Sequence, residues 1–309
     1  MKPLAITLGD PAGIGAEVVF KALQAIDVPV SIFGDRNFAE QSSNLNEHRF
    51  VDVRLSGDQR VRFGMVDPLY GRIALASIDA AVNAVERGEC SGLVTAPIQK
   101  ESIAAAGTQY PGHTELLAAR AGLTRYGHDF AMYFDSPSLR AVLLSVHLPL
   151  REAIGRISGD DVAALARLTT REYARLYGAP PRIAVAALNP HAGEGGRFGD
   201  EEREIRRGIE AARKEGVAIS GPFPADTLFR AALRGKYDVV MAMYHDQALI
   251  PIKTLAFEQS VNVTFGLPYL RVSVDHGTAF DIAGKGVADA APKRYAIEWA
   301  ARHAEAFRT

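Results

Sequence analysis

Three histidines stand just after segments that are expected to form strands. His147 directly follows "AVLLSV", His245 directly follows "DVVMAMY", and His191 comes after "RIAVAALNP". Because strands of an open α/β sheet direct their carboxyl ends toward one crevice, these imidazoles can share a site, although each alone is more often an ordinary hydrogen-bonded side chain. A three-histidine set with open positions is typical of a catalytic metal site. Imidazole favours Zn, Co, Ni or Fe over Mg unless nearby carboxylates shift that preference.

Two acidic residues lie in segments that could reach the same site. Asp246 directly follows His245, and Asp226 lies in "GPFPADTLF". Either carboxylate could orient a metal-bound imidazole or transfer a proton. Asp226 could equally be the N-cap of a helix that begins with "TLFRAAL".

A second group of residues suits an anion. His113 and Thr114 lie in the first turn expected for the helix of "PGHTELLAARAG", where free backbone N–H groups attract negative charge, although Thr114 could simply cap this helix. Lys253, Asn262 and Arg271 stand among mostly apolar residues, where a cation must reach water or meet an anion. Two cations and a neutral amide suit a phosphate monoester, but each could also serve a local salt bridge.

The segments that position these residues alternate between strand and helix patterns. Strands are predicted at 4–8, 30–34, 92–96, 130–134, 141–146, 182–188, 238–244 and 261–266. Helices are predicted at 73–88, at 159–178 with an aspartate at the cap position, and at 199–216. This alternation predicts a mainly parallel α/β sheet, and the turn residues after 130–134 predict one antiparallel hairpin.

Composition narrows the class of protein. The chain has 309 residues, 48% hydrophobic and 23% charged, which allows one large α/β domain or two lobes. A net charge of −1 predicts no nucleic-acid or membrane partner. We find no signal peptide and no apolar run of membrane length, which predicts a cytoplasmic protein. The only cysteine, Cys90, is expected to be a buried thiol. The glycines of "GDPAGIGAE" match neither a Rossmann nor a P-loop fingerprint, but suit a tight strand-to-helix turn.

Eight motifs in chain order resemble the PdxA family of pyridoxal phosphate biosynthesis. They are "GDPAGIG", "GHTE", "VHLPL", "NPHAGEGG", "GPFPADT", "AMYHDQ", "VNVTFGLPYLR" and "VDHGTAFDIAGKG". The resemblance implies an isocitrate/isopropylmalate dehydrogenase-like α/β fold, with two α/β/α lobes around a central cleft, and not a Rossmann fold. The expected lobes are 1–110 with 270–309 on the NAD side, and 111–269 with the metal ligands and the dimer interface.

The resemblance also implies roles for particular residues. The divalent-metal ligands that it implies are His147, His191 and His245. The substrate-binding residues that it implies are His113, Thr114, Lys253, Asn262 and Arg271. The segment "DHGTAFDIAGKG" is similar to the nucleotide-binding segment of the wider superfamily, and predicts NAD(P) contacts from Asp275, His276, Gly277, Thr278 and Asp281. The family works as a homodimer with shared active sites, so one metal ligand can come from the partner subunit.

The reaction implied by the resemblance is the NAD(P)+-dependent oxidation of 4-phosphooxy-L-threonine with one divalent ion per site (Zn, Co, Mn or Mg). Its product is a β-keto acid, which loses CO2 to give 3-amino-2-oxopropyl phosphate. The candidates for the general base are Asp246, then Asp226, then Lys100 in "TAPIQK". Related enzymes oxidise D-threonate or D-erythronate 4-phosphate, or aromatic cis-dihydrodiols. A three-histidine metallohydrolase without nicotinamide and a catalytically silent binding protein are the alternatives from other classes.

Overall fold

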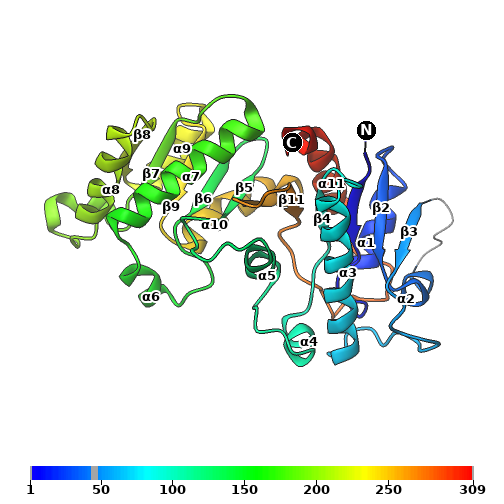
Figure 1. Cartoon of the computed structure of the whole chain (residues 1–309). Helices are drawn as coiled ribbons and strands as arrows, with labels where there is room; N and C mark the ends of the chain where they lie inside the picture. Colours follow the sequence, from blue (N-terminus) through cyan, green and yellow to red (C-terminus); the bar gives the residue numbers. More distant parts are fainter. Residues whose placement is uncertain (1, 43–47, 308–309) are drawn as a thin grey trace. The chain divides into compact units, whose positions relative to one another are not determined.

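The computed structural model describes residues 2–42 and 48–307 of the chain. These residues form two compact units, one made of the segments up to Ala121 and from Pro268 onward, the other made of Gly122–Leu267 (Figure 1). The sequence predicts that residues 111–121 belong to the second lobe, whereas the structure groups them with the first unit. The reason is visible in helix α5 (His113–Arg120), whose Arg120 donates hydrogen bonds to Asp79 and Asn83 of helix α3.

The first unit has a parallel sheet in the order β3-β2-β1-β4-β11. Its strands are β1 (Leu4–Thr7), β2 (Val30–Gly34), β3 (Arg49–Asp52), β4 (Leu93–Thr95) and β11 (Arg271–Ser273). Its helices are α1 (Gly15–Leu23), α2 (Arg36–Glu40), α3 (Pro68–Glu86), α4 (Lys100–Ala105), α5, α11 (Ala291–His303) and the 3-10 turn η3 (Ala304–Phe307). Helix α3 packs on β1 and β2, and α11 packs on α1, β4 and β11.

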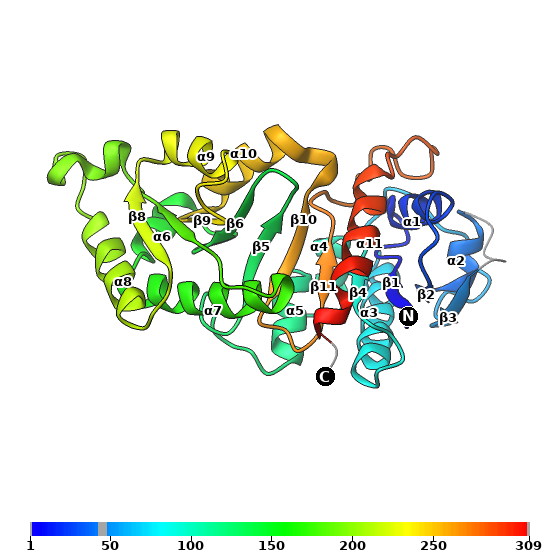
Figure 2. The same cartoon turned by 90° about the horizontal axis from the view of Figure 1, so that it is seen from above.

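The second unit has a mixed sheet in the order β10-β5-β6-β9-β7-β8. Its strands are β5 (Ala131–Asp135), β6 (Arg140–Leu143), β7 (Ile183–Ala186), β8 (Ile219–Phe223), β9 (Val239–Ala242) and β10 (Val261–Phe265). Its helices are α6 (Leu150–Gly155), α7 (Gly159–Tyr177), α8 (Glu202–Lys214), α9 (Ala225–Leu233), α10 (His245–Ala256) and the short turns η1 (Pro190–Gly196) and η2 (Phe257–Gln259). Figure 2 shows α7 and α8 on one face of this sheet and α9 and α10 on the other.

All eight predicted strands overlap observed strands, and the predicted hairpin is confirmed, because β5 and β6 pair antiparallel. Strands β3, β8 and β11 were missed. The strand β8 contains Gly221-Pro222, a pair that resembles a turn in sequence but is tolerated here because β8 is an edge strand. Cys90 is buried, as predicted. No helix in the described residues has the length and apolar character that crossing a membrane requires.

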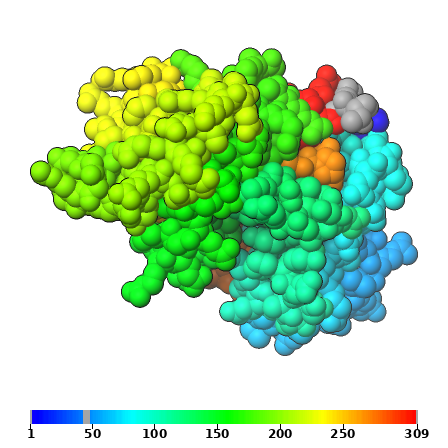
Figure 3. Space-filling view, turned by 60° about the vertical axis from the view of Figure 1, so that its left-hand side comes forward, coloured from blue at the N-terminus to red at the C-terminus, as the bar shows by residue number. Residues whose placement is uncertain are grey.

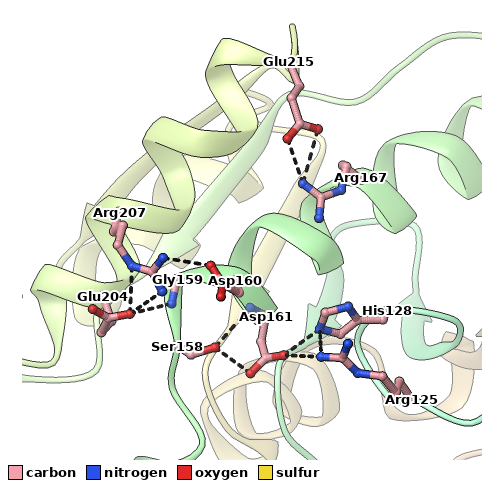
Figure 4. Close-up of polar contacts among 10 residues, drawn as sticks. All are labelled: Arg125, His128, Ser158, Gly159, Asp160, Asp161, Arg167, Glu204, Arg207 and Glu215. Carbon is pink, nitrogen blue, oxygen red and sulfur yellow. Dashed lines mark hydrogen bonds and ion pairs between the residues drawn. The ribbon is translucent and has the colours of Figure 1, made fainter.

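The start of α7 corrects one detail of the prediction. The N-cap is Ser158, whose Oγ accepts from the Asp161 backbone N–H, rather than an aspartate. Hydroxyl caps of this kind contribute about 1 kcal/mol. Asp161 is instead bonded to the ring of His128, at 2.6 Å between Nε2 and Oδ1 (Figure 4). In the same figure Arg207 of α8 donates to Asp160, so that polar contacts fasten α8 to the start of α7.

Candidate functional site

The three strand-end histidines belong to neighbouring strands of the second unit. Strand β9 lies between β6 and β7 and is parallel to both. His147 follows β6, His245 begins the helix after β9, and His191 lies in the turn after β7. The chain therefore brings all three segments to the carboxyl edge of one sheet, which is where ligands bind in open α/β sheets.

His147 and His245 lie close together at this edge. Their ring centroids are 5.9 Å apart, and both rings line a pocket of about 270 Å³. Two imidazoles that bind one ion at about 2.1 Å each have centroids about 5–6 Å apart, so the pair fits a shared divalent metal. His147 has a φ of 44°, a left-handed conformation that costs a non-glycine residue about 1 kcal/mol and is enriched at functional sites.

A carboxylate holds one of these rings. Asp246 Oδ1 lies 2.6 Å from His245 Nδ1. A hydrogen bond at Nδ1 leaves Nε2 as the nitrogen with the lone pair, and metal-binding histidines commonly have such a carboxylate partner. The sequence interpretation of Asp246 as a residue that could orient a metal-bound imidazole is consistent with this contact. Its side chain is 70% exposed, so it also remains accessible to a proton.

His191 is not gathered with the other two. Within residues 2–42 and 48–307, no group of three or more His, Cys, Asp or Glu side chains could hold a metal ion. The turn η1 explains this placement, because the backbone is left-handed over five consecutive residues, from His191 (φ 54°) to Gly195 (φ 71°). His191 is exposed, and its ring lies 6.2 Å from the ring of Phe198. Figure 3 shows the yellow-green surface near residue 200 on the outside of the second unit.

A buried glutamate fixes the start of this turn. Glu202, at 2% exposure, accepts hydrogen bonds from the backbone N–H of Asn189 (2.8 Å) and from its side-chain amide (3.0 Å). Glu201 accepts from the same amide at 2.7 Å. The first turn of α8 therefore holds the segment that precedes His191. Sequence reasoning missed Glu202, which looked like one of several acids in the first turn of a helix.

The remaining base candidates are not deeply buried. Asp226 lies in the first turn of α9, where the N-cap is Pro224, so the alternative that Asp226 caps this helix is wrong. Lys100 is the first residue of α4, in the other unit, and is exposed.

Buried basic groups of the first unit gather around the end of β4. Arg271 is 2% exposed, and its Nη2 donates to the Thr95 hydroxyl at 2.9 Å. Lys293 is 0% exposed, and its Nζ donates to the Thr95 carbonyl oxygen at 2.8 Å. The charges of Arg271 and Lys293 also act on His113, whose Nε2 is buried and has no hydrogen-bond partner among the residues that the structure describes. A basic cluster that is largely withdrawn from water is suited to bind an anion.

The pKa values of this cluster reflect its burial. Burial, and after it the charge of Arg271, lowers the pKa of Lys293 to about 7. Burial likewise lowers the pKa of Arg271 to about 10. The pKa of His113 falls well below its usual value, first because of burial and then because of Arg271 and Lys293. An anion at this place would stabilise the charged form of each group.

The other predicted substrate residues are split between the units. Thr114 is buried in the first turn of α5, but the N-cap of that helix is Gly112, so Thr114 is not its cap. Lys253 on α10 is partly buried. Asn262 on β10 is buried, and its Oδ1 has no hydrogen-bond partner in the described part of the chain. Both of these residues belong to the second unit.

The segment predicted to contact NAD(P) lies against the glycine-containing turn after β1. The backbone N–H of Ile14 donates to the Thr278 carbonyl at 3.0 Å, and a Cβ at Gly13 would lie only 3.0 Å from Thr278. Lys21 of α1 donates to the carbonyls of Gly286 and Ala288. Two segments far apart in sequence therefore form one loop pair, in which Thr278 is buried and Asp275 and His276 are partly buried, whereas Gly277 and Asp281 are exposed.

Comparison with known proteins identifies the family of this chain. The model of a family described as pyridoxal phosphate biosynthetic protein PdxA matches residues 6–300. The chain belongs to the PdxA family. A 4-hydroxythreonine-4-phosphate dehydrogenase of Beijerinckia indica is 42% identical over 326 residues, covering 97% of this chain and 94% of that protein.

Solved structures give the same result for this PdxA chain. A 4-hydroxythreonine-4-phosphate dehydrogenase from Klebsiella pneumoniae superposes with a TM-score of 0.88 at 36% identity, covering 98% of this chain and 100% of that chain. A terephthalate 1,2-cis-dihydrodiol dehydrogenase from Burkholderia xenovorans has a TM-score of 0.66 at 30% identity, covering 97% and 98% of the two chains. The PdxA sequence is thus similar to dehydrogenases with unlike named substrates.

Proposed function

We propose that this PdxA chain is an NAD(P)+-dependent dehydrogenase that oxidises 4-phosphooxy-L-threonine to a β-keto acid, which decarboxylates to 3-amino-2-oxopropyl phosphate. The observation that carries the choice of a phosphorylated substrate is the cluster of Arg271, Lys293 and His113 around Thr95. Nearly full-length relatives named for the same substrate support it.

The metal site that we propose consists of His147 and His245 of one subunit and the partner subunit's His191. Two observations support this arrangement: the first two rings are paired, and His191 is exposed and separate from them. When bound, a divalent ion would supply a Lewis acid for the substrate hydroxyl, and NAD(P)+ would supply the acceptor for the hydride of the carbon that bears this hydroxyl. The softness of imidazole favours Zn or Co, and Mn or Mg are the alternatives.

Each of the chain's own groups then has a defined task. Asp246 keeps the Nδ1 atom of His245 hydrogen-bonded, and its exposed carboxylate is our first choice for accepting the hydroxyl proton, ahead of Asp226 and Lys100. Arg271 and His113 hold the phosphate, with Thr114, Lys253 and Asn262 as further contacts. Holding a substrate at both ends lowers the barrier by several kcal/mol through positioning.

The nucleotide is proposed to contact the segment of Asp275, His276, Gly277, Thr278 and Asp281. Helix α1 holds the chain just after this segment, because Lys21 donates to the Gly286 carbonyl and the carboxylate of Glu17 accepts from the Ala288 N–H at 2.8 Å. Exposed Gly277 has open space where a Cβ would stand, so a ligand can approach the backbone there.

We propose a homodimer in which helix α10 contributes to the interface. Ile250 (65% exposed), Leu255 (49%) and Phe257 (54%) are large apolar side chains exposed on α10 and the adjoining η2. We propose that these side chains form one apolar patch, and such patches commonly mark a protein interface. The same helix begins with His245, so an interface there would place a second copy near the metal pair.

A substrate panel tests the proposed function. Protein stripped of metal and refilled with Zn, Co, Mn or Mg would be assayed by NADH absorbance with 4-phosphooxy-L-threonine, D-threonate 4-phosphate, D-erythronate 4-phosphate and an aromatic cis-dihydrodiol. We expect metal-dependent turnover with the highest kcat/KM for 4-phosphooxy-L-threonine. Preferred turnover of another compound would replace the substrate, and full activity after complete metal removal would refute the metal site.

A further inference from the structure

Lys293 is a lysine in an unfavourable place. It lies in the first turn of α11, its side chain is fully buried, and its Nζ donates to the carbonyl oxygen of Thr95. A lysine is almost never fully buried unless it is paired, and the positive end of the helix dipole disfavours its charge further. The charged residue that acts on it is a second cation, Arg271.

A structural role alone does not explain this charge. The hydrogen bond to Thr95 ties α11 to β4, but a neutral donor could make the same tie. Replacing a buried charge by an apolar group of similar size is often neutral or stabilising. The charged form of Lys293 is therefore costly for the ligand-free fold, and an anion bound nearby would stabilise that form.

Thr95 connects the two cations. Its hydroxyl accepts from Arg271 and its carbonyl from Lys293, so one residue of β4 fixes the positions of both. His113, with its unpartnered buried Nε2, experiences the charge of both residues. Although the carboxylate of Glu115 acts on Arg271, two buried basic side chains lie near a ring nitrogen that has no hydrogen-bond partner in the described protein.

We propose that Lys293 is a positioning residue of the anion site, which places a second buried positive charge beside Arg271 so that the site selects a dianionic phosphate over a monoanionic group. This inference rests on the proposed function only in assuming that the substrate carries a phosphate. Lys293 acts through Arg271 and Thr95, and no direct contact with the substrate is needed.

The protonation of Lys293 distinguishes a role in anion binding from a purely structural contact between α11 and β4. Because the amine of Lys293 has a pKa of about 7, it is mostly neutral at pH 8, and a dianion nearby would draw a proton onto it. The charged or titratable groups that act within this cluster include Arg271, His113, Tyr269 and Glu115. At pH 8 His113 stays neutral because its pKa is far lower, and Arg271 stays charged with its pKa of about 10.

Two variants test the proposal. Lys293→Gln keeps a donor for Thr95 without the charge, and Lys293→Met removes both, whereas Lys214→Met on the surface of α8 is the control. We expect both Lys293 variants to raise the KM for 4-phosphooxy-L-threonine and the Kd for inorganic phosphate by about 10-fold or more, with the KM for NAD+ within about 2-fold. Unchanged phosphate affinity in both variants, or a loss in Lys293→Met alone, would overturn it.

A measurement on the unmodified protein covers the case in which neither variant folds. Sulfate is a dianion that does not titrate at pH 8, so calorimetry in two buffers of different ionisation enthalpy reports protons taken up by the protein. We expect sulfate binding to take up part of a proton, and binding without uptake would contradict the proposal. Phosphate and sulfate binding do not require turnover, so these measurements test the proposed role of Lys293 even if the substrate assignment is wrong.

Discussion

Asp246 shows how a single side chain can prepare another for a ligand. Its contact with Nδ1 of His245 is short, and it leaves the opposite ring nitrogen for a metal. We expect Asp246→Ala to weaken zinc binding by about 10–100-fold, the usual effect of losing such a partner. Competition with a chromogenic chelator would measure this, with Asp58→Ala as the exposed-acid control. Equal zinc affinity in the two variants would show that the contact has no such role.

Asp10 gives a pH-dependent prediction at the same scale. Burial raises its pKa to about 6. The Asp10 carboxyl is therefore harder to ionise in the folded than in the unfolded protein. Its contribution to the free energy of unfolding is fully present below about pH 4 and is lost as the pH rises through about 6. Asp10→Asn can still accept the Ala12 N–H that Asp10 Oδ1 accepts at 2.8 Å. It should therefore raise the free energy of unfolding at about pH 8 by about 1–3 kcal/mol, but not at about pH 4. Urea unfolding at both values checks this, and an equal effect at both would contradict it.

Some of the site could be predicted from single residues and some could not. His147 and His245 were found because strand ends are readable from apolar runs, and adjacent strands do bring them together. Lys293 was missed, since its burial and its neighbour Arg271 are set by packing between α11, β4 and β11. In sequence it is one more lysine near the start of a helix.

At the scale of elements, the regular alternation of strands and helices was the easiest feature to predict. Two of the missed strands are short or interrupted: β11 has three residues, and β8 contains a glycine and a proline. The turn η1 was beyond prediction in detail, because three of its left-handed residues, His191, Ala192 and Glu194, are not glycine. Left-handed conformations of such residues depend on their surroundings rather than on local preference.

The anchoring of turn η1 by Glu202 of α8 can be tested directly. Glu202→Ala leaves the Asn189 N–H without its partner, a loss of about 1–3 kcal/mol for a buried group, so the segment 189–199 should loosen. We expect faster amide hydrogen exchange there and a large fall in turnover, with milder effects in Glu202→Gln, which keeps an acceptor. Glu210→Ala on the same helix is the control. Unchanged exchange in 189–199 would refute the anchoring role.

At the scale of the whole molecule, the proposed assembly makes the exposed apolar residues of α10 part of an interface. A charge at Ile250, which is 65% exposed, should not disturb the fold of one subunit. We expect Ile250→Glu to be folded but largely monomeric by sedimentation and to lose most of its activity, because the site would lack the partner subunit's His191. Lys236→Glu, outside this helix, is the charge-reversal control. A fully active monomer would rule out shared sites.

Subunit complementation tests the central claim, a metal site shared between subunits, most directly. His191→Ala and His245→Ala proteins, each inactive alone, would be mixed, dissociated and reassembled. If each site takes one histidine from the partner, half of the dimers are mixed and each has one intact site, so activity should recover to about a quarter of the wild-type value. If all three histidines of a site come from one chain, every site keeps a mutation. The mixture would then stay inactive, and that result would contradict the shared metal site.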